Sequence, residues 1–206
     1  MPNSMFRSHP ARVGRCGILW CTSAGSTSGR FTPWSRATRI SDQNPAQGRP
    51  ALAAWYRQHA SRLVEVLTAT PADAPAWTLD DRDPTAHFWR RRQVHETLMH
   101  TWDAHEALGR RRPMDPYLAW DGVLEVRDVI YPRQLRLGRV EPLSDAIRLV
   151  ATDVPGDITM GEGEAAIVGG TAEVLLRLLW HRADPETETE MIDPRAGALM
   201  SHALTP

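Results

Sequence analysis

The sequence predicts an α+β fold, in which a helical portion is followed by a small portion of strands and one helix. Apolar residues recur at helical spacing from Pro50 to about residue 131. After Gly138 the pattern changes to short β-like runs separated by glycine and proline turns. Helices and strands are therefore segregated along the chain, which is typical of α+β proteins.

Three helices are predicted in the middle of the chain. The first covers 51–68, and the prolines of "TATPADAP" end it. The second covers 84–108, with Asp83 as the expected N-cap and Gly109 as the left-handed residue after the last turn. The third lies in "YLAWDGVLEVRDVIY", and Pro132 is expected to end it.

The C-terminal portion contains two β-like runs, "IRLVATD" and "EAAIVGG". The turn "VPGD" and the glycine-rich "MGEGE" lie between them, and the helix "TAEVLLRLLWHR" follows the second run. The tail from Ala183 is acidic and polar, and we expect it to be loose.

Residues 1–49 are predicted to be a disordered or atypical leader. They are rich in serine, threonine and glycine and show no sustained apolar period. Their arginine content and near absence of acidic residues resemble an organelle transit peptide. The alternative is a misassigned start or an out-of-frame translation, and the sequence leaves both open.

Charge and composition exclude several classes of function. Residues 1–50 carry seven arginines and one acidic residue, whereas the rest of the chain has 17 arginines against 24 acidic residues. A net-negative body does not favour nucleic-acid binding, which requires a basic face. The chain has no lysine, so a lysine Schiff base or a lysine general base is excluded.

The two cysteines and the apolar runs bear on the compartment. Cys16 and Cys21 both lie in the predicted leader, so the rest of the chain has no disulfide framework and no thiolate metal site. The longest apolar runs are far shorter than the roughly 18 to 20 residues of a membrane-spanning helix. We therefore expect a cytoplasmic protein without a membrane partner.

The stretch "VHETLMHTWD", residues 94–103, carries the main candidate chemistry. His95 and His100 are five residues apart, which does not match the His-Glu-x-x-His pattern of zinc proteases. On a helix, Glu96 and His100 lie one turn apart on one face, and Asp103 lies within the same arc. His95 points to another side of the helix, so His95 and His100 cannot both bind one metal ion.

Three arrangements would satisfy the polar groups of this face, because burying an unpaired carboxylate is costly. They are a divalent metal, an ion pair between Arg92 and Glu96, and partial exposure at the edge of the helices. Spacing alone leaves all three open, since glutamate and histidine pairs of this kind are common on ordinary helices.

A catalytic metal usually has three protein ligands and an open position. Glu96 and His100 would supply two of them. His59, near the centre of the apolar face of helix 51–68, is the best candidate for the third, although a histidine there is more often a core residue. His87 and His9 are weaker candidates.

Three segments together resemble the mycothiol-dependent maleylpyruvate isomerase family of the DinB-like helical superfamily. They are "FWRRRQVHETLMHTWDAHEALG", "LAWDGVLEV" and "IVGGTAEVLLRLLWHR", and the resemblance runs from Trp55 to Arg182. It implies a DinB-like bundle that holds a divalent metal, usually zinc, followed by a smaller α/β domain. Glu96 and His100 match two of the metal ligands.

The resemblance also implies roles for other residues. Asp103 matches a downstream aspartate that would orient the ligand histidine, with a surface salt-bridge role as the alternative. Arg182 is the first choice for binding the substrate's carboxylates and Arg92 the second. Either could instead be an ion-pair arginine, which is the favoured interpretation for Arg177.

The first helix of the family is missing from this sequence or scrambled. Family members begin with a helix that contains a tryptophan and a ligand histidine, and His9 is followed by Pro10 without any helical apolar pattern. The predicted domains are therefore the leader over 1–49, an incomplete helical metal-binding bundle over 50–137, and a small α/β domain over 138–206.

The implied function is that of a metal-dependent isomerase or thiol transferase that uses mycothiol, a small thiol. A metal-stabilised thiolate would add to a cis-alkene conjugated to a carbonyl, the new single bond would rotate, and elimination would give the trans isomer. The alternative is a degenerate member with an incomplete metal site and a non-catalytic binding or structural role. Whether the chain is an enzyme thus depends on a complete metal site. The substrate and the oligomeric state stay open.

Overall fold

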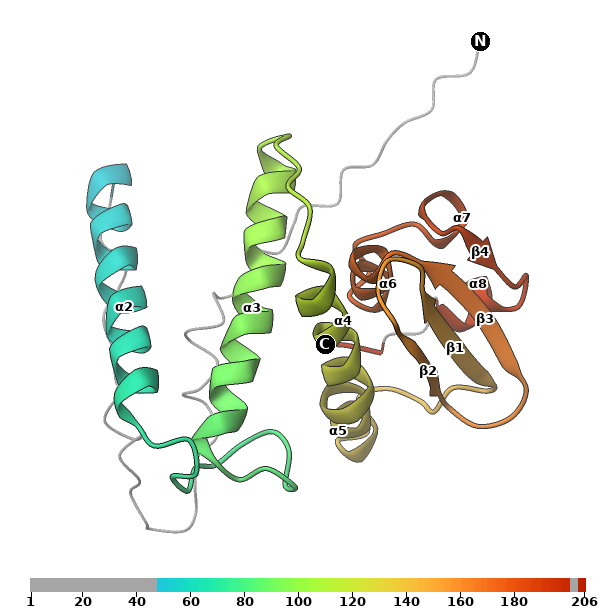
Figure 1. The fold of residues 1–206 in the computed structure, drawn as a ribbon, viewed down its shortest axis with the longest axis horizontal. Coiled ribbons are helices and arrows are strands. Elements are labelled where there is room, and N and C mark those ends of the chain that lie inside the picture. Colours follow the sequence, from blue (N-terminus) through green and yellow to red (C-terminus); the bar gives the residue numbers. More distant parts are fainter. Residues whose placement is uncertain (1–47, 201–203) are drawn as a thin grey trace. The chain divides into compact units, whose positions relative to one another are not determined.

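The computed structural model describes residues 48–200 and 204–206, and the chain forms two compact units (Figure 1). One unit ends at Ala76 and the other begins at Trp77. The predicted leader over 1–49 lies almost entirely outside the described residues.

The described part of the first unit contains one long helix, α2 (Arg49–Ala69). This confirms the predicted helix over 51–68. Pro50 lies in the first turn, where its missing N–H is harmless, and the N–H of Thr70 closes the helix on the carbonyl of Val66. The helix shows the expected stop before the proline-containing loop.

The second unit contains the remaining helices and all the strands of the described residues. The helices are α3 (Ala86–Ala107), α4 (Pro116–Glu125), the π-helical segment η3 (Val126–Ile130), α5 (Tyr131–Arg136), α6 (Ala172–Leu179), α7 (Pro185–Glu188) and α8 (Ala196–Met200). The strands are β1 (Ala146–Ala151), β2 (Asp157–Met160), β3 (Ala165–Gly170) and β4 (Met191–Ile192).

The strands form one mixed sheet in the order β2-β1-β3-β4. β1 pairs with β3 in parallel, and β2 and β4 pair with their neighbours antiparallel. Together with the helices this confirms the α+β class. The sequence predicts β1, β3 and α6 but not β2 and β4, because runs of four and two residues are too short to show an alternating pattern.

The start of α3 differs from the prediction. Asp83 is not the N-cap; that position belongs to Thr85, and the helix begins at Ala86. Asp83 instead accepts a hydrogen bond from the hydroxyl of Thr85 at 2.5 Å, so its carboxylate is used within the turn before the helix. At the other end Gly109 has a φ of +62°, which confirms the left-handed residue.

Pro132 does not end the third helix, contrary to the prediction. The chain passes through it into α5, because the π-helical segment η3 shifts the hydrogen bonds before the proline, and the N–H of Tyr131 bonds to Val126. The carbonyl of Asp128, which a regular helix would pair with the N–H of residue 132, accepts a hydrogen bond from Arg82. A side chain thus replaces the missing donor.

The described residues of the tail from Ala183 form regular structure, contrary to the prediction of a loose tail. It contributes α7, β4 and α8, and it buries Ala196, Leu199 and Leu204 in the apolar core. The hydroxyl of Thr205 donates to the carbonyl of Leu179 at 3.0 Å. The regular structure of the tail was not predicted, because its composition is mostly acidic and polar and only a few apolar residues pack against the sheet.

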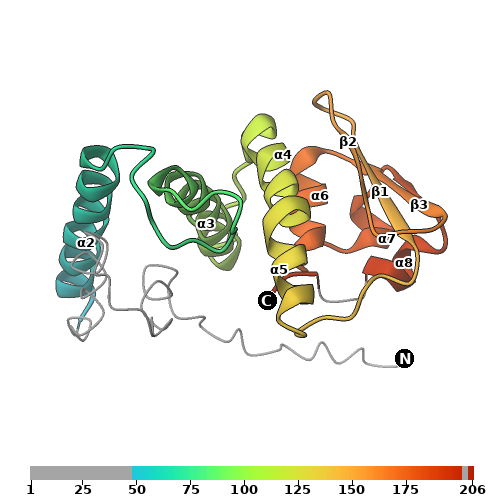
Figure 2. The same ribbon diagram turned by 90° about the horizontal axis from the view of Figure 1, so that it is seen from below.

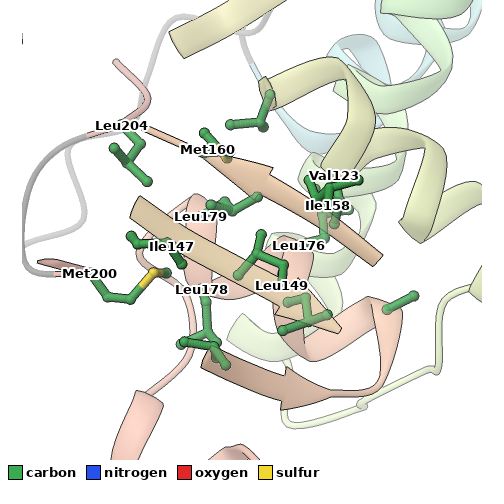
Figure 3. Packing of buried hydrophobic residues seen from close by; sticks show 14 of the residues in the cluster. Val123, Ile147, Leu149, Ile158, Met160, Leu176, Leu178, Leu179, Met200 and Leu204 are labelled. Atoms are coloured by element: carbon green, nitrogen blue, oxygen red, sulfur yellow. The ribbon is translucent and has the colours of Figure 1, made fainter. Parts of the chain in front are cut away.

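The core of the second unit lies between the sheet and the helices α4 and α6. Figure 3 shows the side chains of the strands and of α6 meeting in one cluster, which includes Leu149, Ile158 and Leu176. α4 lies between α3 and α6 in both views (Figures 1 and 2). None of the described helices is long and apolar enough to span a membrane.

Candidate functional site

The site is built on one face of α3, where three polar side chains converge as the spacing predicted. His100 Nε2 lies 3.3 Å from Glu96 Oε2, and His100 Nδ1 lies 3.1 Å from Asp103 Oδ2. Glu96 and His100 are thus neighbours one turn apart, and Asp103 holds the opposite edge of the imidazole ring. The prediction that these residues share a face is confirmed.

The contact with Asp103 indicates which nitrogen of His100 carries the proton. Burial by itself would raise the pKa of Asp103, but hydrogen bonds and charge from Arg182 and His100 lower it below its ordinary value. An ionised carboxylate only accepts hydrogen bonds, so the ring donates from Nδ1, and in the neutral imidazole Nε2 then carries the lone pair. That lone pair faces a carboxylate oxygen of Glu96.

Two acceptor atoms that face each other need a positive group between or beside them. The separation of 3.3 Å between His100 Nε2 and Glu96 Oε2 is close to the distance of about 3.4 Å between two ligand atoms on tetrahedral zinc. The pair therefore has the donor chemistry and the spacing of two metal ligands.

Asp103 is also bound to the C-terminal end of the α6 region. Arg182 donates from Nε to Oδ1 at 2.6 Å and from its NH2 group to Oδ2 at 3.0 Å. Its NH1 group donates to the carbonyl of Trp180 at 2.8 Å. Asp103 therefore contacts the histidine and also forms a salt bridge, and its role in orienting a metal ligand stays a prediction.

The other oxygen of Glu96, Oε1, accepts a hydrogen bond from Arg92, which is buried. Arg92 also donates to Oε2 of Glu125 at 2.7 Å, and that side chain is only 2% exposed. The ion pair between Arg92 and Glu96, one of the three arrangements left open, is thus present. Glu96 is also partly exposed, at 22%, so the third arrangement, partial exposure, is present too.

His95 faces away from this cluster, as predicted. It is 3% exposed, and its Nε2 lies 2.7 Å from Oδ2 of Asp121 on α4. Arg91 makes two hydrogen bonds of 2.9 Å to the same carboxylate. Burial would raise the pKa of Asp121, but Arg91 and then His95 lower it. This second network ties α3 to α4 without contributing a ligand.

The predicted third ligand, His59, lies in the first unit. It is buried, its Nδ1 is 2.7 Å from the carbonyl of Trp55, and its ring lies 4.2 Å from the ring of that tryptophan. Because a carbonyl only accepts, Nδ1 is the donor and Nε2 keeps its lone pair, the form that a metal ligand needs. Its role as third ligand stays a prediction.

The remaining candidates are less central. His87 is exposed on the first turn of α3, and His9 lies outside the described residues. Arg177 is buried and its NH2 group pairs with Glu188 at 2.6 Å, so it is an ion-pair arginine as expected. Within the described parts of the chain, no three His, Cys, Asp or Glu side chains gather as a metal-binding group.

Glu125 belongs to the site, although its sequence pattern did not predict it. It lies in "LAWDGVLEV", one of the three segments quoted above, and a buried arginine such as Arg92 requires an acidic partner. The need of a buried arginine for an acidic partner could have predicted such a residue. The helical pattern alone could not identify Glu125 as that partner.

A cleft of about 430 Å³ lies beside the first turns of α3. Its lining includes His87 and Arg91 of α3 and the carboxylates of Asp83, Glu125 and Asp128. Because acidic groups outnumber basic ones in this lining, the cleft does not suit a substrate with two carboxylates.

Comparison with known proteins finds a similarity to one family over part of the chain. Residues 22–105 match the model of the mycothiol maleylpyruvate isomerase N-terminal domain, which is a DinB-like helical domain. The match begins within the predicted leader and includes His59, Glu96, His100 and Asp103, whereas Arg182 lies beyond it. No curated protein and no solved structure matches the chain. The match supports the resemblance to the mycothiol maleylpyruvate isomerase family over residues 22–105.

Proposed function

We propose that this chain is a metal-dependent enzyme that uses mycothiol, as an isomerase or thiol transferase of the maleylpyruvate isomerase type. One observation carries the proposal. His100 Nε2 and Glu96 Oε2 face each other at 3.3 Å, inside the segment that matches a mycothiol-associated family. Two lone pairs in this arrangement suit a divalent cation.

The residues that would hold the metal are Glu96, His100 and His59. Imidazole nitrogen and carboxylate oxygen are ligands that zinc accepts, and three protein ligands leave a position open for a small molecule. A bound divalent cation would supply the positive charge that stabilises the thiolate of mycothiol.

The neighbouring residues keep these ligands in place. Arg92 binds Oε1 of Glu96, so the carboxylate cannot rotate freely and Oε2 stays directed at the histidine. The two arginines predicted to bind the substrate's carboxylates, Arg92 and Arg182, are both paired with acidic side chains. Substrate binding by either would require one of these ion pairs to open.

The alternative function, a degenerate family member with a binding or structural role, has one observation in its favour. The guanidinium of Arg92 forms an ion pair with Glu96, so this carboxylate has a positive partner without a metal. The two functions differ in the role of His100. In the metal-dependent enzyme its Nε2 would bind the metal, whereas in the degenerate member the ion pair between Arg92 and Glu96 gives Nε2 no positive partner.

Elemental analysis of the purified full chain tests the proposal. We expect stoichiometric zinc in the wild type and its loss in Glu96→Ala, His100→Ala and His59→Ala. The matched control is Glu106→Ala, which removes a partly exposed carboxylate from α3. This variant should keep the metal. A wild type that stays metal-free after expression with zinc would overturn the proposal.

An activity assay separates the two functions. We expect cis–trans isomerisation of maleylpyruvate, or transfer of mycothiol to an electrophile, that depends on both zinc and mycothiol. Bound zinc without turnover in either assay would support the non-catalytic alternative.

A further inference from the structure

The environment of Arg182 differs from that of a substrate-binding arginine. Nε and the NH2 group, the pair of donors that would grip a carboxylate, are both bound to Asp103, at 2.6 and 3.0 Å. NH1 donates to the carbonyl of Trp180 at 2.8 Å. A substrate carboxylate would therefore have to displace Asp103.

The backbone conformation directly before Arg182 helps to position its side chain. His181 has a φ of +56° and is the one described residue other than glycine with a positive φ. A left-handed conformation is unfavourable for a residue with a β-carbon and is kept where the surroundings require it. It turns the chain at the end of α6, and the N–H of Arg182 bonds to the carbonyl of Arg177 at 2.7 Å.

Aromatic contact adds to this placement. The guanidinium of Arg182 lies 5.9 Å from the ring centre of Trp180, and that of Arg92 lies 5.7 Å from the same ring. The two arginines that hold Asp103 and Glu96 thus share one tryptophan. Arg182 is fixed on three sides before any ligand is bound.

The consequence reaches His100 through Asp103. Both oxygens of this carboxylate are held by Arg182, so Oδ2 has one orientation toward His100 Nδ1, at 3.1 Å. The aspartate therefore favours a proton on Nδ1 and, in the neutral ring, leaves the lone pair on Nε2.

We propose that Arg182 is a positioning residue that acts on His100 through Asp103, fixing the tautomer and orientation of the imidazole. This inference rests on the proposed function in assigning His100 to a metal, but the tautomer itself is a property of the metal-free protein. It differs from the direct role in substrate binding that the resemblance implies for Arg182.

The test is imidazole ¹⁵N NMR of the metal-free full chain at about pH 8.5, above the ordinary range of histidine pKa values. The signals of His100 are assigned by comparison with His100→Gln. We expect a protonated Nδ1 and an unprotonated Nε2 in the wild type. Asp103→Asn should invert this pattern, because the side-chain amide binds Arg182 through its oxygen and donates to the ring through its nitrogen.

Arg182→Gln should shift His100 toward the mixture of both tautomers that a free imidazole shows. Zinc titrated into the same samples should bind about 10- to 100-fold more weakly in both variants than in the wild type. Arg111→Gln is the matched control, since it removes a two-fold hydrogen-bonded arginine from Glu106 on the same helix without touching Asp103. It should leave the tautomer and the zinc affinity unchanged.

The outcomes separate the two proposals. If wild-type His100 is fixed and Arg182→Gln releases it, the positioning role stands, even when no zinc binds and the proposed function fails. If Arg182→Gln leaves the His100 spectrum unchanged, the positioning role is overturned, even when zinc binds. An Arg182→Gln variant that raises only the KM for a carboxylate substrate would also overturn it. Should this variant fail to fold, the inversion in Asp103→Asn decides.

Discussion

Two regions of the second unit are held together in different ways. The sheet and α6 bury apolar side chains such as Leu149, Leu175 and Leu176 in one cluster. α3 also buries charged and polar side chains, Arg92 and His95, and it binds its neighbours through ion pairs. Apolar burial is non-directional and supplies stability, whereas charged hydrogen bonds are directional and fix the geometry of a site.

The largest expected effect is in the apolar region. Leu176→Ala removes a side chain that is 1% exposed between α4 and the sheet, and it should lower the free energy of unfolding by about 4 kcal/mol. Urea unfolding followed by circular dichroism measures this. The same substitution at the exposed Leu137 is the control and should change little. A loss below about 1 kcal/mol at Leu176 would contradict a close-packed core.

A smaller loss is expected in the charged region. Arg92→Met leaves Glu125, which is 2% exposed, without its partner and should lower the free energy of unfolding by about 3 kcal/mol. Adding Glu125→Gln should recover much of the loss, because the uncompensated charge is then gone. Arg111→Met breaks an exposed pair and is the control. Equal effects at Arg92 and Arg111 would show that burial of the pair is irrelevant.

The smallest effect is a dependence of stability on pH. Asp103 and Asp121 have pKa values below the ordinary one, since Arg182 and Arg91 outweigh the effect of burial. Their contribution to stability is therefore present above the ordinary pKa of about 4 and is lost as pH falls through the lower folded values. Urea unfolding at a series of acidic pH values should show this decline. Asp121→Asn should flatten it, and an unchanged slope would argue against the pairing.

The sequence predicted the elements that long local patterns define. The helices over α2 and α3 and the strands β1 and β3 were found because their apolar positions repeat along the chain. Pro132 was wrongly read as a stop, since the π-helical segment and the hydrogen bond from Arg82 that accommodate it come from outside the local pattern.

In the candidate site too, local sequence predicted some features and packing decided others. Glu96, His100 and Asp103 converge because a helix places residues three, four and seven apart on one face, so their sequence alone determined that they would meet. His95 was excluded by the same rule, and the structure agrees.

The partners of these residues were decided by the tertiary structure. Arg92 and Glu125 are 33 residues apart, and Asp103 and Arg182 are 79 residues apart. No periodicity links such positions, because they meet only when α4 and the end of α6 pack beside α3. The sequence by itself therefore determined the α+β class and the polar face of α3. Tertiary packing decided which charges hold that face in position, since ion pairs form between whichever opposite charges the packed elements bring within reach.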